Sequence, residues 1–150
     1  MLVAVALVAG CWTNDASPPP PPVESPHVVE RPHPHVRTTT WIGRYECAQG
    51  VTGVQLSLDV DADGTTTGVF AFSAVPDNPT VPSGSYRLRG TTRRLPEGGI
   101  AVELRGDSWI ERPRNYIMVG IDASSDVSRR HMSGRITDAS CGTIDVDRRD

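Results

Sequence analysis

The stretch VQLSLDVDADGTTTGVFAFSA, residues 54–74, decides the fold. Its first half places aliphatic residues at every second position: Val54, Leu56, Leu58 and Val60. Alternation with a period of two is typical of a strand with one buried and one solvated face. A second such run follows at 66–74, and between the two stands Asp63-Gly64, a strong hairpin signal. The stretch therefore predicts two antiparallel strands joined by a tight turn.

Outward from this hairpin, the alternation recurs to the end of the chain and is interrupted at short intervals by Gly, Pro, Asp or Asn. It predicts eight strands, near residues 41–48, 54–60, 66–74, 84–91, 99–105, 115–123, 131–138 and 142–148. Short connections make neighbouring strands antiparallel. We therefore expect an all-β domain, an eight-stranded antiparallel meander that closes into a small barrel. A β-sandwich satisfies the same pattern and is the alternative.

The N-terminal segment MLVAVALVAG, residues 1–10, is too short to span a bilayer, which takes about 18 apolar residues. It has the length of a signal-peptide core. Leu7-Val8-Ala9-Gly10-Cys11 resembles the lipobox of bacterial lipoproteins, although no Lys or Arg precedes the apolar run. The resemblance implies removal of residues 1–10 and lipidation of Cys11, which would anchor the chain to a membrane of the bacterial cell envelope. An ordinary secretory signal with a chance cysteine is the alternative.

The cysteine count agrees with a lipid on Cys11. The chain has three cysteines, and an odd number in an exported protein leaves one thiol without a partner. If Cys11 is acylated, Cys47 and Cys141 remain to form a disulfide in an oxidising compartment. That bond would close a loop of about 95 residues, worth nearly 5 kcal/mol in the chain-entropy model. It would join the first strand to the start of the last.

Residues 11–39 have a different composition from the rest and precede the barrel-like domain that we expect at 40–150. They contain most of the thirteen prolines, including Pro18 to Pro22, which predicts a semi-rigid polyproline II spacer. The spacer also contains His27, His33 and His35. Their spacing on such a helix does not preform a metal site, so we expect solvated imidazoles and no cofactor.

The charge of the chain argues against a nucleic-acid partner. The net charge is −3, and all fifteen basic residues are arginine. Six of these arginines occur as three adjacent pairs beside turn signals: Arg93-Arg94, Arg129-Arg130 and Arg148-Arg149. We interpret the pairs as scattered, solvated charge.

Asp59, Asp61 and Asp63 match the first half of a calcium-binding loop. A complete loop needs a bidentate glutamate where this chain has Phe70. The hairpin turn is therefore the preferred interpretation, and weak calcium binding by the three carboxylates is the alternative.

A hydrolase is the less favoured class of function. His131 is the one histidine after residue 40, and a triad would need it to meet Ser108 or Ser133 in space. No G-x-S-x-G motif surrounds any serine. A bridged Cys47 and Cys141 would not act as nucleophiles.

The most distinctive surface stretch is WIERPRNY, residues 109–116. Trp109, Arg112, Arg114 and Tyr116 are of the residue types that most often dominate interfaces. They predict an interaction surface for a protein or an envelope polymer. The structural alternative is that Trp109 and Tyr116 cap one barrel end, with Arg112 stacked on them.

The chain also resembles two kinds of known domain. YECAQGVT (45–52), PSGSYRLRG (82–90) and WIERPRNY (109–116) resemble a bacterial extracytoplasmic family without an assigned activity, over about 41–148. Trp41-x-Gly43 before a long meander is more loosely similar to lipocalin-like and avidin-like barrels. We thus expect a lipid-anchored binding module, and the alternative is a carrier of a small apolar ligand inside the barrel.

Overall fold

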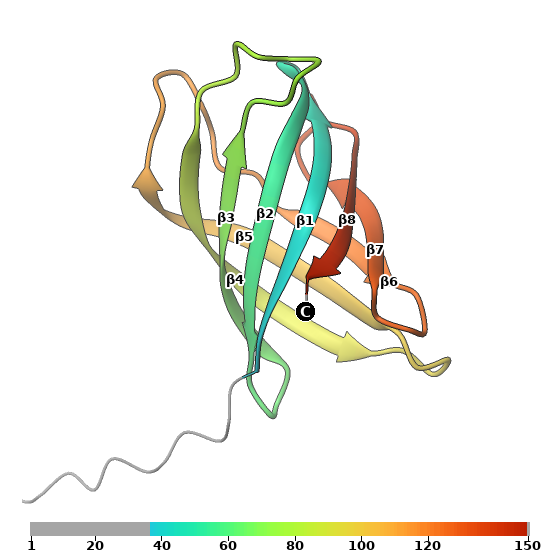
Figure 1. Cartoon of the computed structure of the whole chain (residues 1–150). Coiled ribbons are helices and arrows are strands. Elements are labelled where there is room, and N and C mark those ends of the chain that lie inside the picture. The colour runs from blue at the N-terminus through green and yellow to red at the C-terminus, as the bar shows by residue number, and fades with distance from the viewer. Residues whose placement is uncertain (1–36, 150) are drawn as a thin grey trace, which may run out of the picture. The chain divides into compact units, whose positions relative to one another are not determined.

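Eight antiparallel strands make up residues 37–149, the part of the chain that the computed structural model describes (Figure 1). They are β1 (Arg37–Cys47), β2 (Gly50–Val60), β3 (Thr65–Ser73), β4 (Gly84–Arg94), β5 (Ile100–Glu111), β6 (Ile121–Ser125), β7 (His131–Ile136) and β8 (Thr143–Arg149). No helix in these residues is long and apolar enough to cross a membrane. Three predicted features lie outside the described residues: the signal peptide, lipidation at Cys11 and the spacer with its histidines.

The strands close into a barrel in which sequence neighbours are also spatial neighbours. β8 returns to pair with β1, where Thr40 lies opposite Arg149 and Tyr45 opposite Ile144. Closure pairs the backbone groups that an open sheet leaves exposed at its two edges. The predicted meander barrel is confirmed, and the β-sandwich alternative is wrong.

The meander places its connections alternately at two ends of the barrel (Figure 1). We call one the distal end; it holds the β1–β2, β3–β4, β5–β6 and β7–β8 connections. The other, the N-terminal end, holds the start of β1, the end of β8 and the three remaining turns.

The hairpin predicted from residues 54–74 joins β2 to β3 at the N-terminal end. The Asp61 N–H donates to the Thr65 carbonyl at 2.9 Å, and the Gly64 N–H donates to the Asp61 carbonyl at 3.0 Å. Gly64 has a φ of +88°, a left-handed conformation that a residue without a Cβ adopts at little cost. The Asp-Gly turn prediction is therefore confirmed.

The barrel interior is filled by side chains. The largest fully buried ones are Trp41, Tyr86, Phe70, Leu56, Leu58, Leu88, Leu104, Ile121, Met132, Ile144, Val102 and Val146. Phe70 stacks on Tyr86, with ring centroids 4.9 Å apart, and meets the edge of Tyr45 at 5.2 Å. Such pairs add about 0.5–1.5 kcal/mol each beyond area burial. The middle of the barrel is therefore a packed core.

The predicted boundaries of β5 were wrong. β5 continues to Glu111, well beyond the predicted end at residue 105. Its pairing with β4 continues through two shifts in register. At each shift β5 has one extra residue without a direct partner on β4, first Asp107 and then Ile110. Bulges of this kind bend a strand and increase its twist while pairing continues on either side.

The predicted strand at 115–123 was wrong in its first part, since β6 begins only at Ile121. Residues 112–120 form the β5–β6 loop, in which Asn115 has a φ of +66°. The predicted domain start at 40 was also late, because β1 begins at Arg37 and pairs there with the end of β2.

Candidate functional site at the distal end

A hollow of about 420 Å³ opens at the distal end of the barrel. Its lining includes the side chains of Tyr45, Phe72, Tyr86, Tyr116 and the disulfide-bonded Cys47 and Cys141. These residues come from β1, β3, β4 and two distal loops, so the hollow exists only once the barrel has closed. No charged side chain of the described residues lines it. The hollow therefore offers aromatic surface and neutral polar groups.

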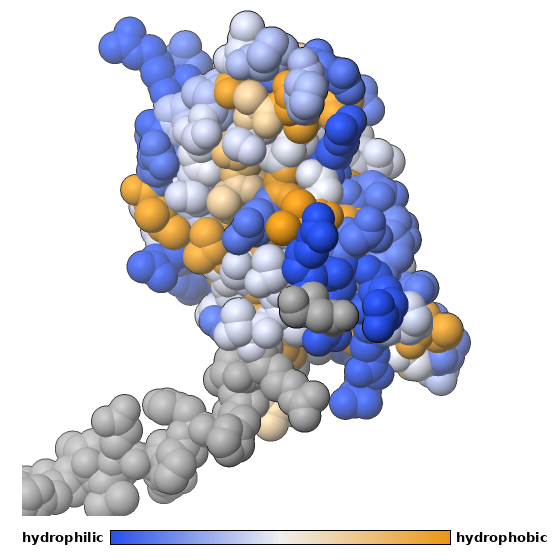
Figure 2. Space-filling model, in the orientation of Figure 1, coloured by the Kyte–Doolittle hydropathy of each residue, from blue (hydrophilic) through white to orange (hydrophobic). Residues whose placement is uncertain are grey.

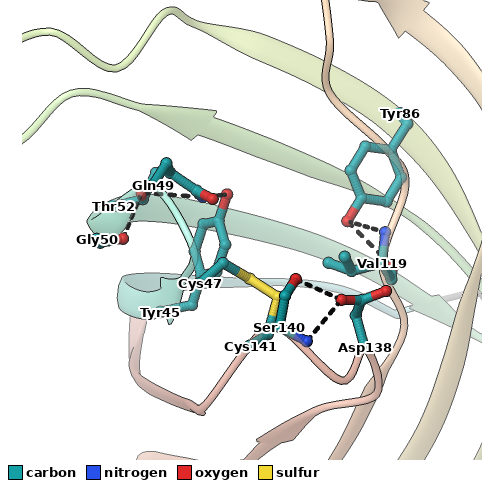
Figure 3. The surroundings of a disulfide bond; sticks show 10 residues. All are labelled: Tyr45, Cys47, Gln49, Gly50, Thr52, Tyr86, Val119, Asp138, Ser140 and Cys141. Atoms are coloured by element: carbon teal, nitrogen blue, oxygen red, sulfur yellow. Dashed lines mark hydrogen bonds between the residues drawn. A yellow bond between two sulfur atoms is a disulfide. The ribbon is translucent and has the colours of Figure 1, made fainter.

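The hydroxyls of Tyr45 and Tyr86, two of the tyrosines that line the hollow, are held by hydrogen bonds (Figure 3). Tyr86 donates to the Val119 carbonyl at 3.1 Å and accepts from the Val119 N–H at 3.3 Å. Tyr45 accepts from the Gln49 amide at 3.2 Å. Burial raises the pKa of Tyr45 to about 12 and raises the pKa of Tyr86 as well. The buried site disfavours a phenolate, so both hydroxyls stay neutral to a higher pH than an exposed tyrosine does.

The disulfide predicted between Cys47 and Cys141 is present and forms one side of the hollow (Figure 3). It joins the end of β1 to the β7–β8 loop, across 94 positions of sequence. The neighbouring Gly142 N–H donates to the Glu46 carbonyl at 2.9 Å. Asp138 tightens the same loop by accepting hydrogen bonds from the Ser140 N–H and hydroxyl. The wall of the hollow is therefore covalently tied to the first strand.

Trp109 and Arg112 lie together beside the hollow. Trp109 is half-buried at the end of β5 and meets Tyr86 edge to face, with ring centroids 5.2 Å apart. The Arg112 guanidinium carbon lies 5.7 Å from the centroid of the Trp109 ring, within cation–π distance. Tyr116 stacks on Phe72 at 5.3 Å. Trp109 and Tyr116 therefore both pack on aromatic side chains at the distal end, with Arg112 over Trp109 alone, and the three side chains remain partly accessible.

Several other features surround this site. Arg114 is exposed in the β5–β6 loop and forms no ion pair with a described residue. Ile110, within the predicted surface stretch, and Ile117, directly after it, are 53% and 60% exposed. Sequence reasoning missed Tyr45 and Tyr86, which the alternation marks only as inward-facing. Their position near the distal opening depends on the register, which the sequence does not show.

No protein-family model matches the chain, and no curated protein matches it significantly. The resemblance to an extracytoplasmic family and the similarity to lipocalin-like barrels therefore stay predictions. The geometry of the barrel ends supplies the argument for function.

Asp59 and Asp63, two carboxylates of the calcium-binding alternative, form hydrogen bonds within the sheet and at the β2–β3 turn. Asp59 accepts a hydrogen bond from the Thr38 hydroxyl, and Asp63 accepts one from the Thr65 N–H at 2.8 Å. Between residues 37 and 149, no three His, Cys, Asp or Glu side chains gather as metal ligands would. Phe70, at the position where a calcium loop needs its glutamate, lies in the core.

His131 lies on the outer wall of the barrel between two carboxylates. Its Nδ1 is 3.1 Å from Asp147, and its Nε2 is 3.4 Å from Asp145. The hydrogen bond to Asp147 is the main reason that the pKa of His131 is raised. Within the described residues, no hydrogen bond joins His131 to Ser108 or Ser133. Both ring nitrogens face aspartates, so this arrangement is not a serine–histidine pair.

Proposed function

We propose that the chain is a bacterial lipoprotein that presents a small β-barrel outside the cytoplasm and binds a protein or an envelope polymer through the distal end. In this proposal Cys11 holds the lipid, and the chain between Cys11 and the start of β1 at Arg37 separates the barrel from the membrane. The observation on which the proposal depends is the neutral, aromatic hollow with Trp109 and Arg112 beside it.

The distribution of exposed hydrophobic residues supports binding at this end. On the face that Figure 2 shows, hydrophilic residues predominate and hydrophobic ones form small separate patches. Among the described residues, three large hydrophobic side chains are more than half exposed: Ile110, Ile117 and Val127. Ile117 lines the distal hollow, and Ile110 lies near the distal end of β5. Exposed apolar groups beside aromatic and arginine side chains are typical of interaction surfaces.

The direction of the chain also supports the proposal. β1 begins at the N-terminal end of the barrel, so the proposed tether would join the barrel at that end. The distal end is the end of the barrel away from this attachment point. The disulfide supports an extracytoplasmic location, because such bonds persist mainly in oxidising compartments.

Site-specific photocrosslinking in the bacterial host tests the binding face. A benzophenone amino acid at Ile117 should give a crosslinked adduct of defined mass, and Arg112→Ala should weaken that adduct. The same probe at Val127, which is 65% exposed at the opposite end, is the matched control. Equal crosslinking at both positions, or an adduct at Ile117 that Arg112→Ala leaves unchanged, would contradict the proposal.

The anchor is tested separately. The wild-type chain should incorporate labelled fatty acid and sediment with membranes, and Cys11→Ser should abolish the labelling. Labelling that survives Cys11→Ser would refute the anchor without bearing on the distal surface.

One observation favours the carrier as a second candidate. The hollow of about 420 Å³ lies within the size range of small-molecule sites, roughly 300–1,000 Å³. The packed core below it confines any ligand to the opening of the barrel. A carrier would therefore hold a small, neutral molecule against Phe72 and Tyr116. Native mass spectrometry of protein isolated from its host membrane should then show a retained small molecule that Tyr116→Ala releases.

A further inference from the structure

Three arginine pairs that are far apart in the sequence meet at the N-terminal end of the barrel. Arg93-Arg94 ends β4, Arg129-Arg130 lies in the β6–β7 turn, and Arg148-Arg149 ends β8. In an antiparallel meander, the ends of even-numbered strands and the turns that follow them share one end. Direct contact confirms the convergence, since the Arg148 N–H donates to the Arg130 carbonyl at 2.7 Å. The interpretation of these pairs as scattered charge was wrong.

Arg94 and Arg148 continue the inward-facing rows of their strands. Arg94 follows Leu88 and Thr92 at every-second spacing, and Arg148 follows Ile144 and Val146. Because side chains alternate along a strand, both arginines belong to the face that lines the barrel. Arg148 lies opposite the buried Trp41, and both arginine side chains are exposed at the opening.

A cleft of about 730 Å³ occupies this opening. Its basic lining consists of Arg93, Arg94, Arg129 and Arg148, and the Trp41 side chain contributes to the same lining. Arg129 enters from the turn, where its Nε donates to the Gly98 carbonyl at 2.9 Å. That bond holds the Nε of Arg129 in place. The two terminal nitrogens of the guanidinium have no hydrogen-bond partner among the described residues.

None of the four cleft arginines forms an ion pair with a described residue. Asp61 and Asp63 also line the cleft, which leaves a local charge of 4 − 2 = +2 in a chain of net charge −3. Hydrogen bonds from Thr65 lower the pKa of Asp63, so this carboxylate remains ionised and is already engaged within the hairpin. The four guanidinium groups therefore outnumber the two carboxylates, and the cleft carries a net positive charge.

We infer that this cleft binds a phosphate-bearing anion, with Arg94, Arg129 and Arg148 as its ligands. A guanidinium is planar and always charged, and its parallel N–H groups match two phosphate oxygens at once. Several guanidiniums from different strands can surround one phosphate, whereas isolated surface arginines cannot. The site is independent of the proposed distal surface, which lies at the other end of the barrel.

The phosphate has two plausible sources, a soluble phosphate compound or the headgroup of an anionic lipid. The first source is tested with inorganic pyrophosphate added to the full chain carrying Cys11→Ser, which removes acylation and thiol exchange at Cys11. Arginine Nε–Hε NMR signals should shift saturably for Arg94, Arg129 and Arg148. Arg94→Gln/Arg148→Gln should weaken binding at least about tenfold, since each charge-assisted contact contributes substantially.

The second source is tested with the same full chain by sedimentation with phosphatidylglycerol vesicles, against phosphatidylcholine vesicles as the neutral reference. The cleft variant should lose at least about tenfold in partition to the anionic vesicles. Arg87→Gln/Arg105→Gln is the charge-matched control, because it removes two exposed arginines of the outer barrel wall that also form no ion pair with a described residue. This control should change either measurement less than about twofold.

Saturable pyrophosphate binding that depends on the cleft assigns a soluble phosphate compound, and cleft-dependent vesicle binding alone assigns a lipid headgroup. Absence of both, or equal losses in the cleft and control variants, would mean non-specific surface charge only and would overturn the inference.

Discussion

Replacing Tyr86 by phenylalanine tests how the distal site is held together. The Tyr86 hydroxyl is the partner of both the N–H and the carbonyl of Val119, and Val119 is only 8% exposed. The variant keeps the aromatic ring, its stack on Phe70 and its contact with Trp109, so the two hydrogen bonds are the main loss.

The expected loss of stability follows from the N–H and the carbonyl of Val119, which lose their hydrogen-bond partner in the variant. A buried polar group without a partner costs about 1–3 kcal/mol, so two groups give an expected loss of about 2–4 kcal/mol once limited access of water is allowed for. For a domain of this size, that corresponds to a fall in Tm of roughly 8–16 °C. Urea unfolding of the full chain, followed by tryptophan fluorescence, measures the free energy of unfolding directly.

Tyr116→Phe is the matched control. The Tyr116 hydroxyl forms no hydrogen bond with a described residue, so its removal should change the free energy of unfolding by less than about 0.5 kcal/mol. Hydrogen exchange at the Val119 amide should accelerate in Tyr86→Phe and not in Tyr116→Phe. If Tyr86→Phe unfolds within 0.5 kcal/mol of the wild type, about the size of the control effect, the argument that this hydroxyl anchors the β5–β6 loop is wrong.

Three further predictions concern the disulfide, His131 and calcium. Cys47→Ala/Cys141→Ala should lower the free energy of unfolding by up to about 4.7 kcal/mol, because the bond closes a long loop; a loss below about 1 kcal/mol in urea unfolding would contradict this. The raised pKa of His131 stabilises the folded state below the unfolded pKa, near 6.5, and this contribution is lost as pH rises through the folded pKa. Stability should therefore fall slightly more between pH 6 and 8 in the wild type than in His131→Gln, and identical pH profiles would refute the ion-pair account. Calcium at about 1 mM should shift Tm by less than about 1 °C, and a rise of many degrees at micromolar calcium would restore the calcium interpretation of Asp59, Asp61 and Asp63.

The local pattern of the sequence was sufficient to predict the hairpin and the fold class. Asp63-Gly64 stands between two alternating runs, and both the turn and the pairing of the runs depend on residues near in sequence. The disulfide was accessible from counting, because the expected acylation of Cys11 would leave Cys47 and Cys141 as the one possible pair. The end of β5 and the loop at 115–120 could not be predicted from the local pattern or from counting. They depend on bulges at Asp107 and Ile110, which arise from pairing across the closed sheet.

The binding features at the two ends of the barrel depend on long-range geometry. The alternation shows that Tyr45 and Phe72 face inward, but not that they meet Tyr116 at one opening. The arginine pairs look scattered along the chain, and the direction of each strand brings them to one end.

The sequence by itself therefore determined an all-β meander with a defined inner face, because strand periodicity and turn chemistry are local properties of the backbone. Only the tertiary structure decided that the barrel closes, that its middle is packed, and that one opening is neutral and aromatic while the other is rich in arginine. The physical reason is that register and closure are set by pairings between β1 and β8 and across the bulged β4–β5 ladder, and these pairings join residues that no local pattern relates.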